Sequence, residues 1–311
     1  PVLTAQGDRL RAECFSACNG VYARMDIFQN ALDGEILYGT TNVDIGSDLR
    51  KALFKIKQGD RLSLRIGEEG WKSLHSRTLP AGQEITDILI QRPVQMPDRW
   101  IRALGNCAML HQKMKYRFHL EGMQAKAFMA SLPAATGKEQ SGWLTPTKTG
   151  ASLSFREEKD SVYISGLHRL SALKRMMSHV QEIYFYAPEG DAPGQMMLEV
   201  CMNGARLTLS LTAKSYEGYS GEGALLESLS DMRTLENADS IDSVLNFEPK
   251  LDLEQMAKSM KMGKADLSDA IELLAVSGKL GFDVHENAFF HREFPDDPDR
   301  VLKDNPRLVA A

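Results

Sequence analysis

Ser220 comes nearest to a catalytic motif, within a glycine-rich run from Tyr216 to Gly223. A hydrolase serine usually lies in a Gly-x-Ser-x-Gly turn, and the order Gly218-Tyr219-Ser220-Gly221-Glu222-Gly223 misses that spacing. No Lys-Ser or Lys-Thr pair follows, as it would in a nucleotide phosphate-binding loop. Two acids flank the serine and would disfavour an oxyanion beside it. The run therefore favours a tight loop that caps a helix, with a hydrolase using Ser220 as an alternative.

A second turn-rich segment, residues 38–46, carries oxygen ligands. Thr41, Asn42 and Asp44 offer hydroxyl, amide and carboxylate groups, but the calcium-loop pattern is absent. The same residue types also simply make turns. We keep these three residues as candidate loop contacts, together with Tyr219, Ser220 and Glu222.

Metal ligands are sparse in the sequence. Cys14 and Cys18 would share a face of a strand, and His285 and His291 flank a hairpin turn, but a structural zinc site needs four ligands. The seven histidines form no Cys/His or Ser/His/Asp signature, and no dinucleotide, Walker or zincin motif occurs. The sequence predicts no enzyme and no cofactor within residues 1–311.

Two windows of the chain are basic. Residues 50–65 hold six basic residues and one acid, and residues 99–126 hold six and one as well. If the windows converge, they form a patch for nucleic acid or for an acidic partner; ordinary solvated faces are at least as good an interpretation. The candidate interaction residues are Arg50, Lys51, Lys55, Lys57, Lys113, Lys115 and Arg117.

Composition narrows the class of protein. The 311 residues carry a net charge of −5 and a pI near 5.9, which gives no global bias toward nucleic acid or membrane. No apolar run approaches the roughly 20 residues that span a bilayer. The four cysteines are too few and too scattered for a disulfide scaffold. We expect a cytoplasmic protein with no membrane contact.

The elements that position these residues read as two α+β units. Residues 9–79 and 151–213 each follow a strand-strand-helix-strand-strand plan, which is a possible duplication of mixed α/β type that ring clamps also use. Asn19-Gly20 predicts a hairpin. In its second strand Val21, Ala23, Met25 and Ile27 alternate with Tyr22, Arg24 and Asp26, so one face is buried. A helix is expected around Leu170 to Val180. We expect domains at 1–140 and 141–232.

Residues 233–311 are expected to hold an acidic connector, a winged-helix-like module and the start of a C-terminal helix. The connector, 216–248, has eight acids and one base, and beyond one short helix it reads as solvated. In 251–294, Asp252 and Asp266 are expected to cap two helices, and a hairpin follows. The second helix carries acids and no base, which favours protein contact over DNA binding. A helix beginning near Pro306 stops at Ala311, so we expect the natural chain to continue.

Five segments together suggest a family: Gly39 to Asp44, Tyr216 to Gly223, Gly281 to Val284, Phe290 to Pro295 and Asn305 to Leu308. They resemble the bacterial SWIM zinc finger proteins, in the region ahead of the finger. Members tend to be encoded beside a MoxR-type ATPase and a von Willebrand type A protein, which implies a non-enzymatic partner in an ATPase-driven conflict or stress system. The family's Cys-x-Cys and Cys-x-His motifs are absent here, so zinc is expected only in a finger after Ala311.

These observations predict a non-catalytic interaction or scaffold protein. One alternative is a nucleic-acid-binding protein, clamp-like or winged-helix, that uses the basic windows. The other is the hydrolase that uses Ser220.

Overall fold

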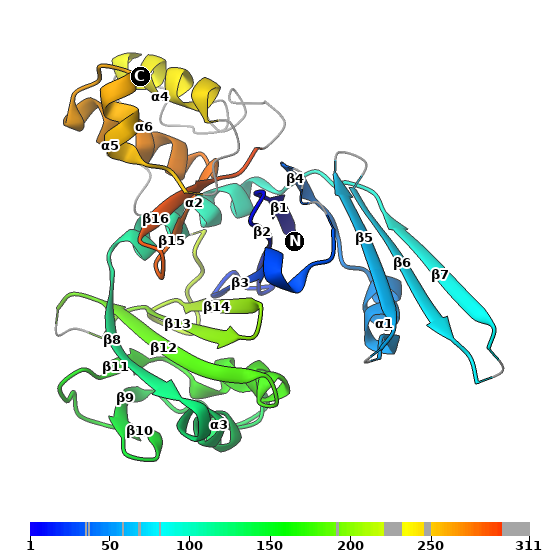
Figure 1. The fold of residues 1–311 in the computed structure, drawn as a ribbon. Helices are drawn as coiled ribbons and strands as arrows, with labels where there is room; N and C mark the ends of the chain where they lie inside the picture. The colour runs from blue at the N-terminus through cyan, green and yellow to red at the C-terminus, as the bar shows by residue number, and fades with distance from the viewer. Residues whose placement is uncertain are drawn as a thin grey trace.

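An eight-stranded antiparallel sheet forms the centre of the computed structural model (Figure 1). The structure describes residues 1–293 except 35, 37, 58, 68–69, 81, 191–192, 221–231 and 246–249. In sheet order the strands are β4 (Gly39–Asn42), β1 (Val2–Ala5), β2 (Arg9–Phe15), β3 (Val21–Phe28), β14 (Ala205–Leu211), β13 (Met196–Met202), β12 (Val180–Pro188) and β8 (Met114–Glu121). The fold is thus mixed α+β, as predicted. Strands from the two predicted domains, 1–140 and 141–232, share this one sheet.

One face of the sheet is apolar. Over β14, β13, β12 and β8 it is covered by α3 (Gly122–Ser131), by the 3₁₀ helix η2 (Leu167–Met176), and by a small sheet of β10 (Gly150–Ser154), β9 (Gly142–Thr147) and β11 (Val162–Ile164). The helix expected up to Val180 is therefore a 3₁₀ helix that ends at Met176, and Val180 already begins β12.

Over β2, β3 and β14 the opposite face is polar and buried. The predicted hairpin at Asn19-Gly20 joins β2 to β3, and the alternation along β3 is confirmed. However, Arg24 and Asp26 are at most 1% exposed, whereas Val21 and Met25 on the apolar side are only half-buried. The polar face is covered by α2 (Asp98–Gln112) and by the hairpin of β15 (Leu280–Asp283) and β16 (Ala288–His291) (Figure 1).

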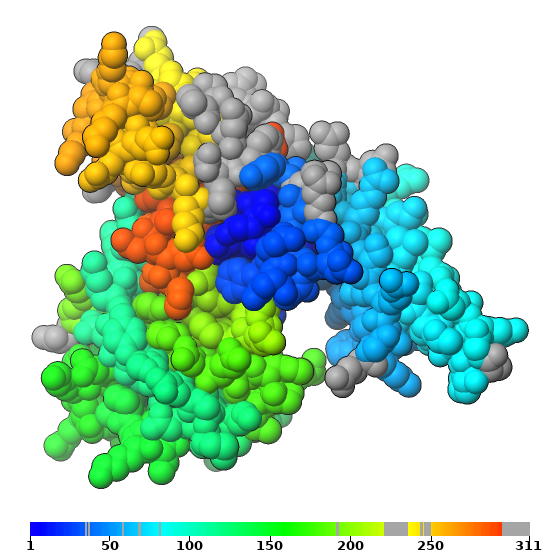
Figure 2. Space-filling model, in the orientation of Figure 1, coloured from blue at the N-terminus to red at the C-terminus, as the bar shows by residue number. Residues whose placement is uncertain are grey.

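A separate arm projects from the β4 edge of the sheet (Figures 1 and 2). It consists of α1 (Ser47–Lys55) and a three-stranded sheet of β5 (Arg61–Gly67), β6 (Gly70–Thr78) and β7 (Glu84–Gln91). The predicted unit 9–79 is therefore divided: its first two strands belong to the large sheet and its last two to the arm. Strand β7 was not predicted. Leu49 of α1 packs with Trp71 of β6 and with Leu3 and Val43 of the body, which attaches the arm.

Three helices follow the large sheet: α4 (Met232–Val244), α5 (Leu253–Ser259) and α6 (Lys264–Val276). The Asp252 side chain accepts a hydrogen bond from the Gln255 amide, which confirms the predicted cap of α5. The second predicted cap is wrong, because Gly263 is the N-cap of α6 and Asp266 lies in its first turn. Residues 216–248 are not all solvated connector either, since α4 buries Ala238 and Ile241 against the apolar core of α6. The expected helix at 305–311 lies outside the described residues.

No helix in the described part of the chain is long and apolar enough to cross a bilayer.

Candidate protein-binding groove and its charged foundation

A groove of about 520 Å³ opens between α2, α5 and α6. Its apolar lining comes from Met109 of α2, Leu253 and Ala257 of α5, and Leu267 and Ile271 of α6, and it ends on Phe289 of β16. Leu253, Met256, Ala257 and Met260 form an apolar stripe along α5 and the residue after it, and all four are only half-buried. The stripe is incompletely covered because α5 is only seven residues long and makes one wall of the groove.

The rim of the groove carries both charges on each wall. Glu254 and Lys258 lie on the α5 side, and Lys264 and Glu272 lie on the α6 side. Met109 and Met262 add flexible thioether side chains to the lining, and such side chains adapt to different apolar partners. The groove therefore combines an apolar lining with charged side chains of both signs.

The floor of the groove depends on a close approach between α2 and α6. A Cβ added at Gly105 of α2 would lie 2.5 Å from the carbonyl oxygen of Val276, the last residue of α6. Ala108 and Met109, on the same helix, pack into the core of the C-terminal helices, while Leu104 and Cys107 pack toward the sheet. Helix α2 thus couples the groove to the large sheet.

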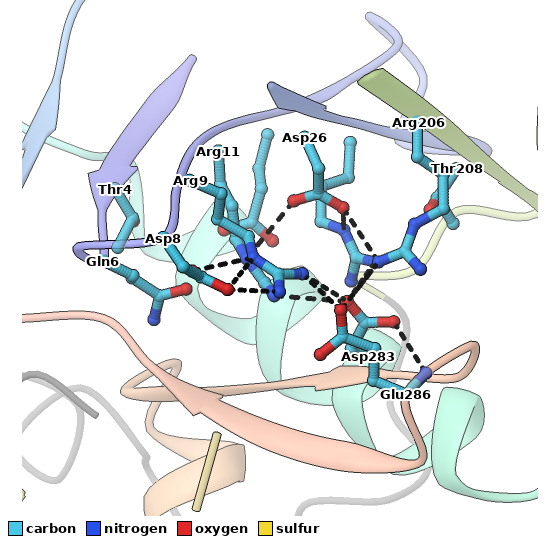
Figure 3. Close-up of polar contacts among 12 residues, drawn as sticks. Thr4, Gln6, Asp8, Arg9, Arg11, Asp26, Arg206, Thr208, Asp283 and Glu286 are labelled. Atoms are coloured by element: carbon cyan, nitrogen blue, oxygen red, sulfur yellow. Dashed lines mark hydrogen bonds and ion pairs between the residues drawn. The ribbon is translucent and has the colours of Figure 1, made fainter. Parts of the chain in front are cut away.

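Beneath the groove, the β15–β16 hairpin meets the sheet through buried charges (Figure 3). Asp283 of β15 contacts four guanidinium groups: Arg24 at 3.0 Å, Arg11 at 3.2 Å, Arg9 at 3.6 Å, and Arg206 in a short hydrogen bond. Asp26 of β3 bonds Arg11, Arg24 and Arg206 from the other side. Burial alone would raise the pKa of Asp283, but the charges of Arg24, Arg206 and Arg11 outweigh it and hold that pKa well below its ordinary value.

A second buried pair fixes the far end of the hairpin. Arg292 donates two hydrogen bonds to Glu13 of β2, at 2.6 and 2.7 Å, and also bonds the Gly278 carbonyl oxygen at 2.8 Å. Burial would raise the pKa of Glu13, but the charge and hydrogen bonds of Arg292 and the Tyr22 hydroxyl lower it from 4.5 to about 2. Phe290 lies between these groups, with the Arg11 guanidinium 3.7 Å from its ring centre. We call Glu13, Arg11, Arg24, Asp26, Arg206, Asp283 and Arg292 the charged junction.

The glycine-rich run around Ser220 serves packing where the structure describes it. Tyr219 is buried; its amide donates to the Asn19 carbonyl oxygen at 2.9 Å, and its hydroxyl contacts the Ser210 hydroxyl at 2.7 Å. Asn106 of α2 donates to the Tyr219 carbonyl oxygen at 2.6 Å. The candidate loop contact Glu222 lies outside the described residues. The arrangement seats the described part of the run across the Asn19-Gly20 turn.

The other predicted site residues do not converge either. Thr41 is buried in β4, the Asn42 side chain donates to the Val94 carbonyl oxygen at 3.1 Å, and Asp44 is exposed. His285 lies 3.3 Å from Glu199 and His291 lies 3.4 Å from Asp242, so the two histidines contact different acids. Across the described ranges, no cluster of three or more His, Cys, Asp or Glu residues is arranged to hold a metal ion.

The candidate interaction residues of the two basic windows belong to elements at opposite edges of the large sheet (Figure 1). Arg50, Lys51, Lys55 and Lys57 belong to the arm beside β4, whereas Lys113, Lys115 and Arg117 begin or precede β8. Seven strand spacings separate β4 from β8, which is about 34 Å at a spacing of about 4.8 Å. They therefore form two separate surfaces and no common patch.

The comparisons with known proteins add a general likeness only. No protein-family model matches the chain, and neither does any curated protein sequence. The PCNA2–PCNA3 complex from Sulfolobus tokodaii is 10% identical, with a TM-score of 0.46 over 68% of this chain and 88% of that chain. The proliferating cellular nuclear antigen from Entamoeba histolytica is 13% identical, with a TM-score of 0.45 over 68% of this chain and 87% of that chain. At this level of similarity we draw no functional conclusion from the likeness.

Proposed function

We propose that this chain is a non-catalytic protein-interaction scaffold whose groove between α2, α5 and α6 receives the apolar face of an amphipathic helix. The groove itself is the observation that carries the proposal: it is wide, apolar at its floor and built from three helices. Amphipathic helices dock into such grooves through apolar residues spaced three and four apart. Because each wall carries one Lys and one Glu, a helix with both charges on its flanks is complementary to the rim.

The resemblance to SWIM zinc finger proteins supports a choice of partner. We include in the proposal that a MoxR-type ATPase or a von Willebrand type A protein supplies the helix, that the assembly works in the cytoplasm, and that it belongs to a conflict or stress system. The module of α5, α6 and the β15–β16 hairpin then acts as a winged-helix-like protein-contact unit. Its acidic second helix, with Asp266, Asp269 and Glu272, supports this role over DNA binding.

The test fills the groove without changing the fold. Ala257 is half-buried in the lining, so Ala257→Trp places an indole where the partner helix would lie. Gln255→Trp, on the exposed side of the same helix, is the matched control. Binding of the purified ATPase and of the von Willebrand type A protein is measured by calorimetry. We expect Ala257→Trp to weaken one of them at least about tenfold and the control to leave it unchanged. Equal affinities for both variants, or no binding by the wild-type chain, would contradict the proposal.

A nucleic-acid-binding role keeps one observation in its favour. Helix α1 presents Arg50, Lys51 and Lys55 together with Phe54, whose side chain is 76% exposed. Cations beside an exposed aromatic ring suit single-stranded nucleic acid. This alternative predicts binding of a single-stranded oligonucleotide that weakens steeply with salt and is lost in Phe54→Ser. Salt-independent or absent binding rules it out.

A further inference from the structure

Strand β7 is an unprotected edge strand. Its eight residues pair with β6 in one continuous register, from Glu84 opposite Thr78 to Gln91 opposite Trp71, with no bulge. Among the described residues no strand pairs with its other side. Ile88 is 58% exposed and Ile90 is 60% exposed. Proteins blunt such edges with lysine, proline, a bulge or other charges; β7 contains no lysine, proline or bulge, and its two charges are Glu84 and Asp87.

The neighbouring strands give this edge a charge. In the register of the arm sheet, Lys72 lies opposite both Arg65 and Ile90, and Leu74 lies opposite Ile88. Residues opposite each other in an antiparallel sheet point to the same face, so Arg61, Arg65, Lys72, Leu74, Ile88 and Ile90 share one face. Helix α1 covers the other face, where Leu49 packs on Trp71. We call the face that carries Ile88 and Ile90, opposite to α1, the outer face of the arm.

The cations of the outer face have no acidic partner where the structure describes the chain. Arg61, Arg65 and Lys72 are all exposed, and none of them forms an ion pair with a described residue. Of the two acids of β7, Asp87 lies on the covered side, within 4.0 Å of Arg77, and Glu84 lies on the outer face at the end of the strand, opposite Thr78. The outer face thus combines three free cations with an apolar row along β7.

We propose that β7 accepts an extended, acidic and apolar polypeptide segment of a partner protein as a fourth strand of the arm sheet. Main-chain hydrogen bonds to β7 would supply affinity, and alternate side chains would supply specificity. Acidic side chains on the outer face complement Arg61, Arg65 and Lys72, while apolar side chains cover the isoleucines. A nucleic acid fits this face less well, because it would bury Ile88 and Ile90 against phosphates and would find no aromatic ring to stack on.

The first test uses a defined peptide as the probe. A fluorescein-labelled octapeptide of alternating glutamate and valine is titrated with the full chain, and anisotropy is recorded. We expect saturable binding. A peptide of the same composition with four glutamates followed by four valines should bind at least about tenfold more weakly, because only alternation places the acids on one face. Two further peptides carry backbone N-methyl groups at even or at odd positions. If the peptide pairs with β7 as a strand, only alternate amides of the peptide donate to β7. One of the two N-methylated peptides should therefore lose binding.

Variants of the chain locate the site. The triple variant Arg61→Gln, Arg65→Gln, Lys72→Gln removes the cations of the outer face, and we expect about tenfold weaker binding. The matched control Arg50→Gln, Lys51→Gln, Lys55→Gln removes the same charge from α1 on the covered side and should change the affinity less than about twofold. Ile88→Asp with Ile90→Asp should abolish binding. Far-UV circular dichroism confirms that each variant folds.

Four results would overturn the proposal. These are no binding of the alternating octapeptide, equal loss in both charge variants, full binding by both N-methylated peptides, and tighter binding of a single-stranded oligonucleotide to the same outer face. Self-association of the wild-type chain that is lost in Ile88→Asp with Ile90→Asp, measured by light scattering, would assign the edge to a second copy of the chain instead and would overturn it too.

Discussion

At the scale of single residues, the charged junction buries acids and arginines together in the interior. Taking a charge from water into a protein interior costs several kcal/mol, and this cost is recovered only when opposite charges and hydrogen bonds surround it. Asp283 is the group on which four arginines from β2, β3 and β14 converge. Because it belongs to the hairpin and they belong to the sheet, the junction holds the hairpin in one register on the sheet.

We predict that Asp283→Ala destabilises the protein by about 3–5 kcal/mol, because it removes a charge shared by four buried guanidinium groups. Among the described residues, Asp26 is then the one carboxylate that Arg11, Arg24 and Arg206 still share. Urea unfolding followed by circular dichroism measures the change. Asp48→Ala is the control: the Asp48 side chain is 82% exposed and should contribute within about 0.5 kcal/mol. A loss for Asp283→Ala no larger than that of the control would show that the junction is not formed in solution.

A buried histidine gives a second prediction at this scale. Burial first, and then the charge of Arg24, lower the pKa of His111 from 6.5 to about 3. The unfolded chain binds a proton below about pH 6.5, while folded His111 remains neutral, so stability falls as the pH falls through this window. The slope is about 1.4 kcal/mol per pH unit between pH 6.5 and pH 3.

His111→Phe should remove this contribution. The difference between wild type and variant in the free energy of unfolding is measured by urea titration at a series of pH values below 7. His179→Phe, at an exposed site on the chain, is the matched control. Parallel pH profiles for wild type and His111→Phe would mean that His111 takes up its proton while the protein is folded.

The residue patterns in the sequence predicted which side chains share a face of a strand, but they did not predict which face would be buried. Arg9, Arg11 and Glu13 alternate with Leu10 and Ala12 along β2, and such alternation normally puts the charged side in water. The charged side is buried here because the hairpin supplies Asp283 and Arg292 from about 270 residues further along the chain. A single strand contains no signal of that distant partner.

At the scale of elements, α2 determines the width of the groove. Glycine inside a helix normally costs about 1 kcal/mol relative to alanine, so Gly105→Ala would ordinarily stabilise α2. Here a Cβ would lie 2.5 Å from the Val276 carbonyl oxygen, and backbone cannot move aside as a flexible side chain can. We predict a net loss of about 1–3 kcal/mol.

Thermal or urea unfolding measures this effect. Arg102→Ala, on the exposed side of the same helix, should be close to neutral. If Gly105→Ala instead raised the stability, α2 and α6 would not approach each other as closely as the structure shows.

Elements with strong local signals were the predictable part of the fold. Asp252 with Gln255 predicted the start of α5, and Asn19-Gly20 predicted the β2–β3 hairpin. Strand β7 was missed although Ile85, Ile88 and Ile90 are typical strand residues, because they do not follow a strict alternation with polar neighbours. Helix α4 was taken as solvated because its many acids outweigh the short stripe of Ala238, Ile241 and Leu245. The groove was unpredictable, since its walls come from α2 and α5, about 150 residues apart.

At the scale of the whole molecule, sheet order decides which surfaces can act together. Both basic windows were identified from the sequence, but only the strand order shows that α1 and β8 lie at opposite edges. The strand order also joins β3 to β14, whose residues are 177 or more apart in sequence. Pairing between such distant segments cannot be read from local patterns, because it is set by the packing of the assembled chain.

The same arrangement predicts which parts of the chain can be removed. The arm leaves and re-enters the body at neighbouring points, since the Val94 amide donates to the Asn42 carbonyl oxygen at 2.8 Å. Replacing residues 46–91 by a short Gly-Ser linker should lower the melting temperature, because Leu3 and Val43 lose their contacts with Leu49 and Trp71, but should keep one cooperative transition.

Ending the chain at residue 220 instead strips Asp283 and Arg292 from the charged junction, and leaves Arg11, Arg24, Arg206 and Glu13 without them. We expect that variant to lose cooperative unfolding and to bind the hydrophobic dye ANS. A cooperative chain of 220 residues would mean that the hairpin is not what completes the fold of the sheet, whereas a non-cooperative chain without the arm would mean that the body does not fold without the arm.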